Sequence, residues 1–292
     1  MRKQFPKTIQ EIMATDERLV VLLGDIGVFG FRHVFSEYPQ RIYNIGILEQ
    51  STISVAAGLA IQDFVPVVHT IAPFIVERAL EQLKDDFGYQ QLGGNFVSVG
   101  ASYDYASLGC THHCPGDVGI LKNIPEMEII LPGSAAEFDS LFKQAYANGH
   151  PSYFRLSEES NADSLPVEFG KGLVVKLGAK ATVLAVGNML DRVVSACADL
   201  DVTILYYTTL SPFDTQLLRA NYNSKIVVCE PYYSGALAHD ILQSIAPRPA
   251  ALLSIGVPRQ FLRKYGSIDE HNKHLGLDVV GLRDQITSFI AD

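Results

Sequence analysis

Short, unbroken runs of apolar residues alternate with longer segments of helical periodicity along most of the chain. The first run, at 19–23, reads Leu-Val-Val-Leu-Leu and ends at Gly24 and Asp25. A short run that is apolar at every position is typical of a strand buried on both faces of a parallel sheet. Strands that alternate with helices predict a doubly wound α/β fold.

The alternation occurs twice, which predicts two doubly wound domains. In the first series we expect strands at 19–23, 41–45, 65–69, 96–99, 129–131 and 153–156, with helices at 5–13, 49–61, 74–89 and 135–147. A polar stretch at 157–164, followed by Pro166, is typical of a linker. In the second series we expect strands at 181–186, 202–206, 225–229 and 251–255, with helices at 190–199, 236–244 and 282–290. The expected domains are therefore 1–165 and a smaller one at 166–292.

Charge and composition exclude several classes of partner. The 292 residues carry 32 acidic and 23 basic side chains, and a net charge of −9 disfavours a nucleic-acid or anionic-membrane surface. No segment reaches the roughly 18 consecutive apolar residues of a membrane span, and 1–10 lacks the apolar core of a signal peptide. The four cysteines are too few for a disulfide scaffold. We therefore expect a cytoplasmic protein that binds neither nucleic acid nor membrane.

Three polar features follow strands at one edge of the first predicted sheet. Asp25 comes after the first strand, Glu49 after the second, and the loop 100–117 after the strand at 96–99. In open parallel sheets, ligands bind beyond the carboxyl ends of the strands. The pattern therefore predicts that Asp25, Glu49 and this loop converge on one ligand site.

Glu49 directly precedes a helix that is rich in small residues. Apolar neighbours would partly remove its carboxylate from water, which suits it to share a proton with a ring nitrogen. The same position is also explained by an acid that only favours the dipole at a helix N-terminus. Both interpretations fit the local sequence.

Phe74 follows Pro73 at the start of the predicted helix at 74–89. Its ring could lie flat against a planar ligand. Packing in the core explains the position equally simply, and the local sequence favours packing.

The stretch 109–117 reads Gly-Cys-Thr-His-His-Cys-Pro-Gly-Asp and is the most unusual in the chain. Two cysteines, two histidines and an aspartate suggest zinc, but structural zinc sites usually use two separated ligand pairs, and no second pair follows. Paired histidines in a Gly-rich loop at a ligand edge fit acid/base work or hydroxyl recognition better. Histidines that are simply exposed to water are the remaining explanation.

Several motifs in fixed order resemble the C-terminal half of transketolases, and especially the small subunit of split bacterial or archaeal members. They are Gly24-Asp25, GILEQ at 46–50, AAGLA at 56–60, APF at 72–74, RALEQ at 78–82, GCTHH at 109–113 with Asp117, and IPEM at 124–127. Each motif is weak alone, whereas their order and spacing are specific. The resemblance covers the whole chain, more generically in the second domain. It implies a pyrimidine-binding, thiamine-diphosphate-type domain at 1–165 and a transketolase C-terminal-like domain at 166–292.

The resemblance implies a role for each matched residue. Glu49 matches the catalytic glutamate that hydrogen-bonds the aminopyrimidine ring of thiamine diphosphate and promotes loss of the thiazolium C2 proton. Phe74 matches the aromatic residue that packs on that ring, with Ile71 as the alternative if the helix start is shifted. His112 matches a catalytic histidine near the reacting carbonyl of the substrate, and Asp25 an acid that lines the cofactor cleft.

One motif of the family is missing. Transketolases hold the diphosphate and its metal with Gly-Asp-Gly followed later by Asn, and this sequence contains no Gly-Asp-Gly. The stretch Gly93-Gly94-Asn95 lacks the acid that a divalent cation needs. The resemblance therefore implies that Mg²⁺ (or Ca²⁺) and the diphosphate are held mainly by an N-terminal transketolase subunit, in an α2β2 complex, and that this chain supplies no metal ligand.

The substrate end departs from the family. Glu158 stands where members carry an arginine for the sugar phosphate, and Gly100 and Leu108 replace a histidine and an acid. A carboxylate repels a phosphate. We therefore expect a sugar without a terminal phosphate, for example a nucleotide-linked acceptor, unless Arg2 or Arg155 supplies the missing charge. The candidate substrate-binding residues are His112, His113, Arg2, Arg155 and Glu158.

Two other functions stay open on the sequence. The β subunit of a 2-oxo acid dehydrogenase shares the fold and the cofactor glutamate, whereas a non-catalytic partner subunit needs only the fold. The pair His112 and His113, with Asp117, favours a transketolase-type transferase over the dehydrogenase. Retention of Glu49 and His112 argues against a non-catalytic role.

Overall fold

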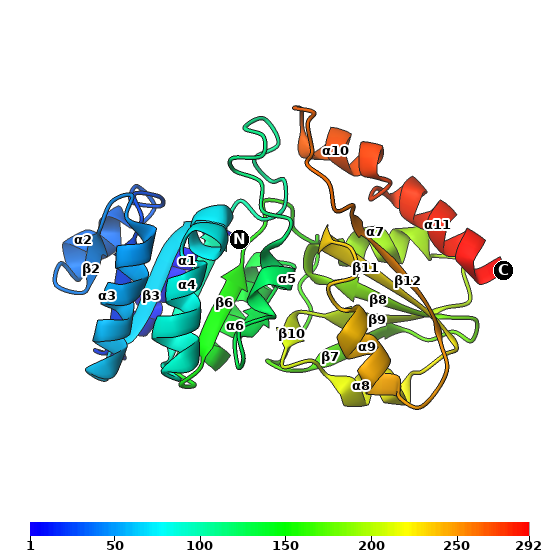
Figure 1. Cartoon of the computed structure of the whole chain (residues 1–292), viewed down its shortest axis with the longest axis horizontal. Coiled ribbons are helices and arrows are strands. Elements are labelled where there is room, and N and C mark those ends of the chain that lie inside the picture. The colour runs from blue at the N-terminus through cyan, green and yellow to red at the C-terminus, as the bar shows by residue number, and fades with distance from the viewer. Residues whose placement is uncertain (292) are drawn as a thin grey trace.

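Two α/β domains lie next to each other along the long axis of the molecule (Figure 1). The computed structural model describes residues 1–291. The first domain is built on a seven-stranded sheet with the order β10-β5-β6-β4-β3-β1-β2, and the second on a five-stranded sheet with the order β12-β11-β8-β9-β7. The predicted fold class, two successive α/β units with mainly parallel sheets, is confirmed.

The first sheet is parallel except at one edge. Its strands are β1 (Leu19–Leu23), β2 (Ile42–Asn44), β3 (Val65–Ile71), β4 (Gly94–Val99), β5 (Glu128–Ile130), β6 (Pro151–Arg155) and β10 (Thr209–Ser211). β10 comes from the second half of the sequence and pairs antiparallel with β5, so it ties the two halves together. The sequence pattern does not reveal this strand, because three residues carry too little periodicity.

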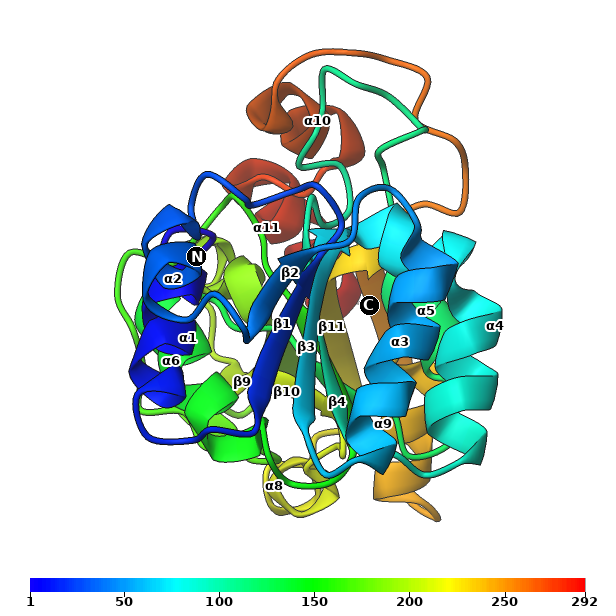
Figure 2. The same ribbon diagram turned by 90° about the vertical axis from the view of Figure 1, so that its left-hand side faces the viewer.

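Helices cover both faces of the first sheet (Figure 2). One face carries α1 (Phe5–Met13) and α6 (Ala135–Ala145), and the other carries α3 (Glu49–Ile61), α4 (Leu80–Gln82) and α5 (Asp117–Leu121), while α2 (Arg32–Glu37) precedes β2. Alternate residues of β1 contact opposite cores: Val21 and Leu23 lie in one hydrophobic cluster, and Val20 and Leu22 in the other. Burial on both faces is the reason that this strand is apolar at every position.

The second domain repeats the arrangement on a smaller sheet. Its strands are β7 (Gly172–Lys176), β8 (Thr182–Val186), β9 (Thr203–Tyr207), β11 (Lys225–Tyr233) and β12 (Ala251–Val257). Its helices are η3 (Gly187–Met189), α7 (Leu190–Ala196), α8 (Thr215–Ala220), α9 (Ala238–Ile245), α10 (Ile268–Leu275) and α11 (Val279–Ala291). The edge strand β7 runs antiparallel to β9. Within residues 1–291, no helix combines the length and the apolar character that crossing a bilayer requires.

The helix expected at 74–89 is not one regular α-helix. Two π-helical segments, η1 (Phe74–Arg78) and η2 (Leu83–Tyr89), lie on either side of the short α4. A π turn closes one residue later than an α turn and frequently occurs at functional sites. In η1 the wide turn brings Arg78 over the ring of Phe74, with 4.2 Å between the guanidinium carbon and the ring centre.

Candidate active site

The loops after β1 and β2 are joined by hydrogen bonds at the carboxyl edge of the first sheet. The Asn44 side chain accepts a hydrogen bond from the backbone N–H of Asp25 at 3.0 Å and donates one to the Asp25 carboxylate at 3.1 Å. Asp25 has a φ of 63°, a left-handed conformation that aspartate tolerates better than most residues. The exposed Asp25 carboxylate is therefore held at the rim of the edge where α3 begins.

Glu49 is the first residue of α3, and its side chain is only 4% exposed. Its Oε2 accepts a hydrogen bond from Nη1 of Arg78 at 2.9 Å. Its Oε1 is buried and has no hydrogen-bond partner within the described part of the chain. A buried oxygen without a donor costs stability, and most such atoms in proteins are satisfied. The free oxygen therefore marks a position where a bound ligand can share a proton with the protein.

Phe74 lies between this carboxylate and the histidine loop. One face of its ring contacts the guanidinium of Arg78, which is a cation–π arrangement. The His112 ring lies 5.6 Å from the Phe74 ring, at an interplanar angle of 66°. Ile71, the alternative candidate, is only 5% exposed and packs in the core. Of the two, Phe74 is half-buried and has surface to offer to a flat ring.

The two histidines of the loop point into different surroundings. His112 is half-buried, and its Nδ1 lies 2.9 Å from the Thr111 hydroxyl. His113 is buried, and its Nε2 lies 3.2 Å from the carbonyl oxygen of Tyr105. Burial lowers the pKa of His113 below its usual range. His112 is thus available to a substrate, whereas His113 holds the loop together from the inside.

Arg155, for which the sequence predicts a substrate role, lies in the interior of the protein. Its side chain is 1% exposed, and its Nε donates to the buried Asp117 carboxylate at 2.6 Å. Its Nη2 donates to the hydroxyl of Ser102 at 2.7 Å. Arg155 ends a central strand, so its guanidinium is enclosed by the loop 100–117 and by β11, which packs above it. In this structure Arg155 is enclosed and contacts Asp117 and Ser102, and its contact with a substrate stays a prediction.

Gly100, which stands where the resemblance predicts a histidine, has no room for a side chain. Its φ is +74°, and a Cβ built on it would collide with the ring of Tyr105. Tyr105 thus fills the space that a side chain at position 100 would need, and its ring packs edge-on against His112 at 6.0 Å. Leu108 is exposed on the same loop. In this chain Tyr105 therefore fills the space beside Gly100 and contacts His112.

Glu158 and Arg2 line one cavity of about 440 Å³ at the mouth of this edge, together with Lys3 and Lys7. Arg2, Lys3 and Lys7 also line a second cavity of about 760 Å³ that reaches Asp25. Three cations and one carboxylate, that of Glu158, therefore line the first of these cavities. A substrate in this cavity would meet positive as well as negative side chains, so the Glu158 carboxylate alone does not decide whether the cavity favours an anion.

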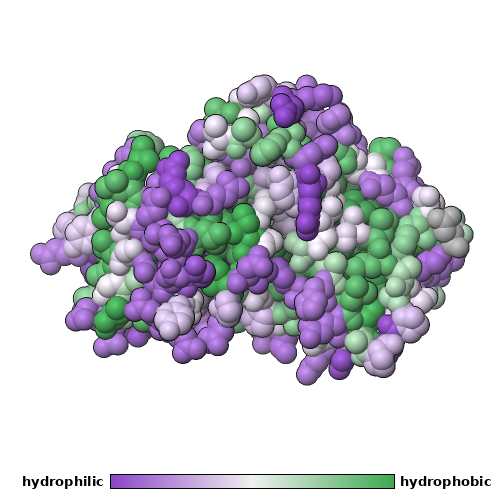
Figure 3. All heavy atoms as spheres, viewed as in Figure 1, coloured by the Kyte–Doolittle hydropathy of each residue, from purple (hydrophilic) through white to green (hydrophobic). Residues whose placement is uncertain are grey.

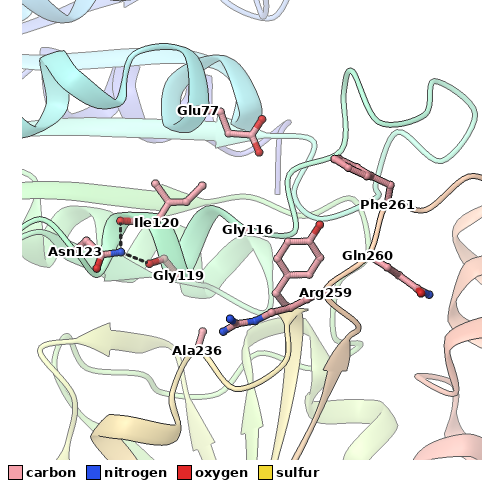
Figure 4. A pocket seen from close by; sticks show the side chains of 10 residues that line it. Glu77, Gly116, Gly119, Ile120, Asn123, Ala236, Arg259, Gln260 and Phe261 are labelled. Carbon is pink, nitrogen blue, oxygen red and sulfur yellow. Dashed lines mark hydrogen bonds between the residues drawn. The ribbon is translucent and has the colours of Figure 1, made fainter.

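A further cavity of about 600 Å³ lies between the domains (Figure 4). Glu77, next to Arg78 in η1, lies on one side, and Arg259, Gln260 and Phe261 of the second domain lie on the other. Burial raises the pKa of Glu77, and the Cys114 thiol donates to its carboxylate at 3.6 Å. The second domain therefore contributes surface next to the active-site loop.

The structure brings Glu49, Phe74 and His112 into one chain of contacts, with Asp25 at its rim. Arg78 completes this set and was not identifiable from local pattern, because the sequence does not show which carboxylate an arginine in this helix meets. Tyr105 escaped notice for the same reason, since its partner Gly100 is recognised only by its backbone geometry.

The family is decided by two domain models. The transketolase pyrimidine-binding domain matches residues 1–162, and the transketolase C-terminal domain matches residues 170–282. The chain belongs to the transketolase family. The resemblance noted from the sequence motifs is thereby confirmed.

Two relatives match this chain over nearly their whole length. The chain is 40% identical over 291 residues, 98% of its length and 93% of the relative's, to an uncharacterized 33.6 kDa protein in the fasciation locus of Rhodococcoides fascians. It is 27% identical over 303 residues to one subunit of the apulose-4-phosphate transketolase of Phocaeicola vulgatus, covering 99% of this chain and 97% of that subunit. A solved structure described as a split gene transketolase, inactive beta4 tetramer, superposes with a TM-score of 0.88 at 22% identity, covering 99% and 97% of the two chains. That likeness shows a shared fold.

Proposed function

We propose that this chain is the pyrimidine-binding subunit of a two-chain, thiamine diphosphate-dependent transketolase that transfers a two-carbon ketol unit between sugars. The observation that carries the proposal is the buried, unpartnered Oε1 of Glu49, whose carboxylate contacts the same Arg78 guanidinium as the half-buried ring of Phe74. These two groups suit an aminopyrimidine, which needs a proton-sharing carboxyl and a flat apolar contact.

Each residue of the site has a task in this proposal. When bound, thiamine diphosphate supplies a nucleophilic carbon that accepts the ketol group. Glu49 shares a proton with the pyrimidine ring nitrogen, and Arg78 fixes the orientation of its carboxylate through Oε2. Phe74 supports the ring, and His112 moves a proton at the substrate oxygen. Asp25 closes the rim of the cleft.

A second subunit is part of the proposal. The chain has no Gly-Asp-Gly motif for the diphosphate and Mg²⁺ (or Ca²⁺), so a diphosphate-binding N-terminal subunit would hold both, in an α2β2 complex. Large apolar side chains are exposed around the site, among them Phe29, Ile47, Leu48 and Val55. Hydrophobic residues reach the surface at the left-hand end of the molecule, where α3 lies (Figure 3). Exposed apolar surface of this kind is typical of a protein interface.

The relatives support a subunit rather than a complete enzyme. One is named as a subunit of a transketolase, and the structural neighbour is described as an inactive tetramer of one chain type. The free thiols, three of them buried, are consistent with a cytoplasmic location. We also propose that the boundary between the two domains lies near residue 165.

Reconstitution tests the proposed function. The chain would be mixed with its diphosphate-binding partner, thiamine diphosphate and Mg²⁺, and two-carbon transfer would be followed by mass spectrometry of the sugar products. We expect transfer only when both chains are present, and no micromolar binding of thiamine diphosphate to this chain alone. Release of CO₂ from pyruvate by the complex, without ketol transfer, would replace the proposal with a 2-oxo acid dehydrogenase. A complex that binds the cofactor but transforms neither substrate class would make the chain a non-catalytic subunit.

A further inference from the structure

A segment of the second domain reaches over the active-site loop. The Tyr103 hydroxyl donates to the Asn272 side chain of α10 at 2.5 Å. The His271 ring of the same helix lies 5.9 Å from the ring of His113, the neighbour of His112. The segment 258–274 is therefore packed directly on the loop that carries the proposed substrate histidine.

This segment encloses a cavity of about 470 Å³ with a strongly positive lining. Its polar lining residues are Gln260, Arg263, Lys264, His271 and His274, and no acidic residue lines it. Within residues 1–291, neither Arg263 nor Lys264 forms an ion pair, although the chain as a whole carries a net charge of −9. Free cations in a concave site favour an anionic ligand.

The nearby acids of the segment are used elsewhere. The Glu270 carboxylate accepts hydrogen bonds from the backbone N–H of Ser267 at 2.8 Å and from its hydroxyl at 3.1 Å, which completes a capping box for α10. Asp269 lines a different cavity, beside Glu158 and Glu159. Neither carboxylate is placed to neutralise Arg263 and Lys264.

A buried imidazole supports a ligand site rather than a solvated basic surface. His271 is only 3% exposed although it lines the cavity, and its Nε2 is buried without a hydrogen-bond partner within the described residues. A solvated surface of lysines and arginines gives no reason to bury an unpartnered ring nitrogen. An anion in the cavity would supply the countercharge that the two exposed cations lack.

We propose that this cavity binds a phosphate or diphosphate ester group, and that the group belongs to the sugar substrate. The second part rests on the proposed function, whereas anion binding does not. The site lies on the second domain next to the loop of His112, and Glu158 is not among the residues that line it. The anionic group of the substrate, such as the diphosphate of a diphosphate-linked sugar, would then lie in this cavity. A terminal phosphate beside Glu158 would not be needed.

Inorganic pyrophosphate is the probe for the first part. Isothermal titration would compare the full chain with the double variant Arg263→Gln/Lys264→Gln, and with Lys273→Gln as a control. Lys273 is exposed on α10, the helix of His271 and His274, but does not line the cavity. We expect saturable binding at one site, at least tenfold weaker in the double variant and within twofold of wild type in the control. Ring resonances of His271 and His274 should shift with the same saturation curve.

Two results would overturn the site. One is binding that is absent or not saturable, and the other is equal weakening in the double variant and in Lys273→Gln, as for nonspecific attraction. This titration needs neither the partner nor the cofactor, so it stands apart from the proposed function. In the reconstituted enzyme, the double variant should raise KM for a diphosphate-linked sugar at least tenfold with little change in kcat. An unchanged KM would show that the anion site does not serve the substrate.

Discussion

Replacing Arg155 separates an internal role from a substrate role. Arg155→Met removes one member of a fully buried ion pair and leaves Asp117 without its main countercharge. Loss of one partner of such a pair costs about 3–5 kcal/mol. Asp117 keeps two donors, the Tyr153 hydroxyl at 3.0 Å and the backbone N–H of Val118 at 2.9 Å. We therefore expect about 3 kcal/mol, the lower end of that range.

Urea unfolding of the isolated chain measures this loss. At a slope of about 3 kcal/mol per molar urea, the midpoint should fall by about 1 M. The double variant Arg155→Met/Asp117→Asn removes both charges, and it should recover much of the lost stability because no buried charge is left unpaired. An unchanged midpoint in Arg155→Met, combined with a large rise in KM for the sugar, would refute the internal role.

Three further predictions address the loop and its surroundings. His112→Ala should lower kcat/KM of the reconstituted enzyme about a hundredfold, as for loss of an acid/base group. It should not slow exchange of the C2 proton of the cofactor. Slower exchange would show that His112 acts on the cofactor instead of the substrate. Gly100→Ala should destabilise the chain by about 1–3 kcal/mol in thermal unfolding because its Cβ meets Tyr105, and Tyr105→Ala in the same chain should relieve part of that cost; a neutral Gly100→Ala would contradict the packing. Burial raises the pKa of Asp104 to about 7, so the folded chain keeps a proton that the unfolded chain releases near pH 4. The contribution of Asp104 to the free energy of unfolding therefore falls as the pH rises from about 4 to about 7. Asp104→Asn should remove this fall when urea unfolding is measured across the same pH range. The same pH dependence in the variant and the wild type would contradict the prediction.

The alternating pattern predicted most strands of the two sheets, although not β7 or β10. The run at 19–23 is apolar at every position because both faces of β1 are buried, so the sequence alone indicates the burial. The rule that ligands bind at carboxyl ends of parallel strands placed Asp25, Glu49 and the loop 100–117 at one edge. These inferences succeed because each depends on local periodicity and on a topology that parallel strands share.

Other features depend on contacts between distant residues. β10 is too short to have a pattern, and it exists because β5 offers an edge for it. The sequence predicts that Arg155 binds substrate, because nothing local reveals its buried hydrogen bond to Asp117, 38 residues earlier. The pairing of Arg78 with Glu49 spans 29 residues and needs the π turn of η1. The helix α10 was not predicted, although the sequence carries its signals: a capping Ser267 with Glu270, and Gly276 at its end.

The central claim is that Glu49 provides the proton-sharing group for a pyrimidine cofactor. Its direct test is hydrogen–deuterium exchange at C2 of thiamine diphosphate, followed by NMR in the complex of this chain with its diphosphate-binding partner. Glu49→Gln keeps the size of the side chain and a hydrogen-bonding group but removes the acid. Exchange should slow by about a hundredfold or more while the cofactor remains bound. Exchange at the wild-type rate in the Glu49→Gln complex would contradict the account.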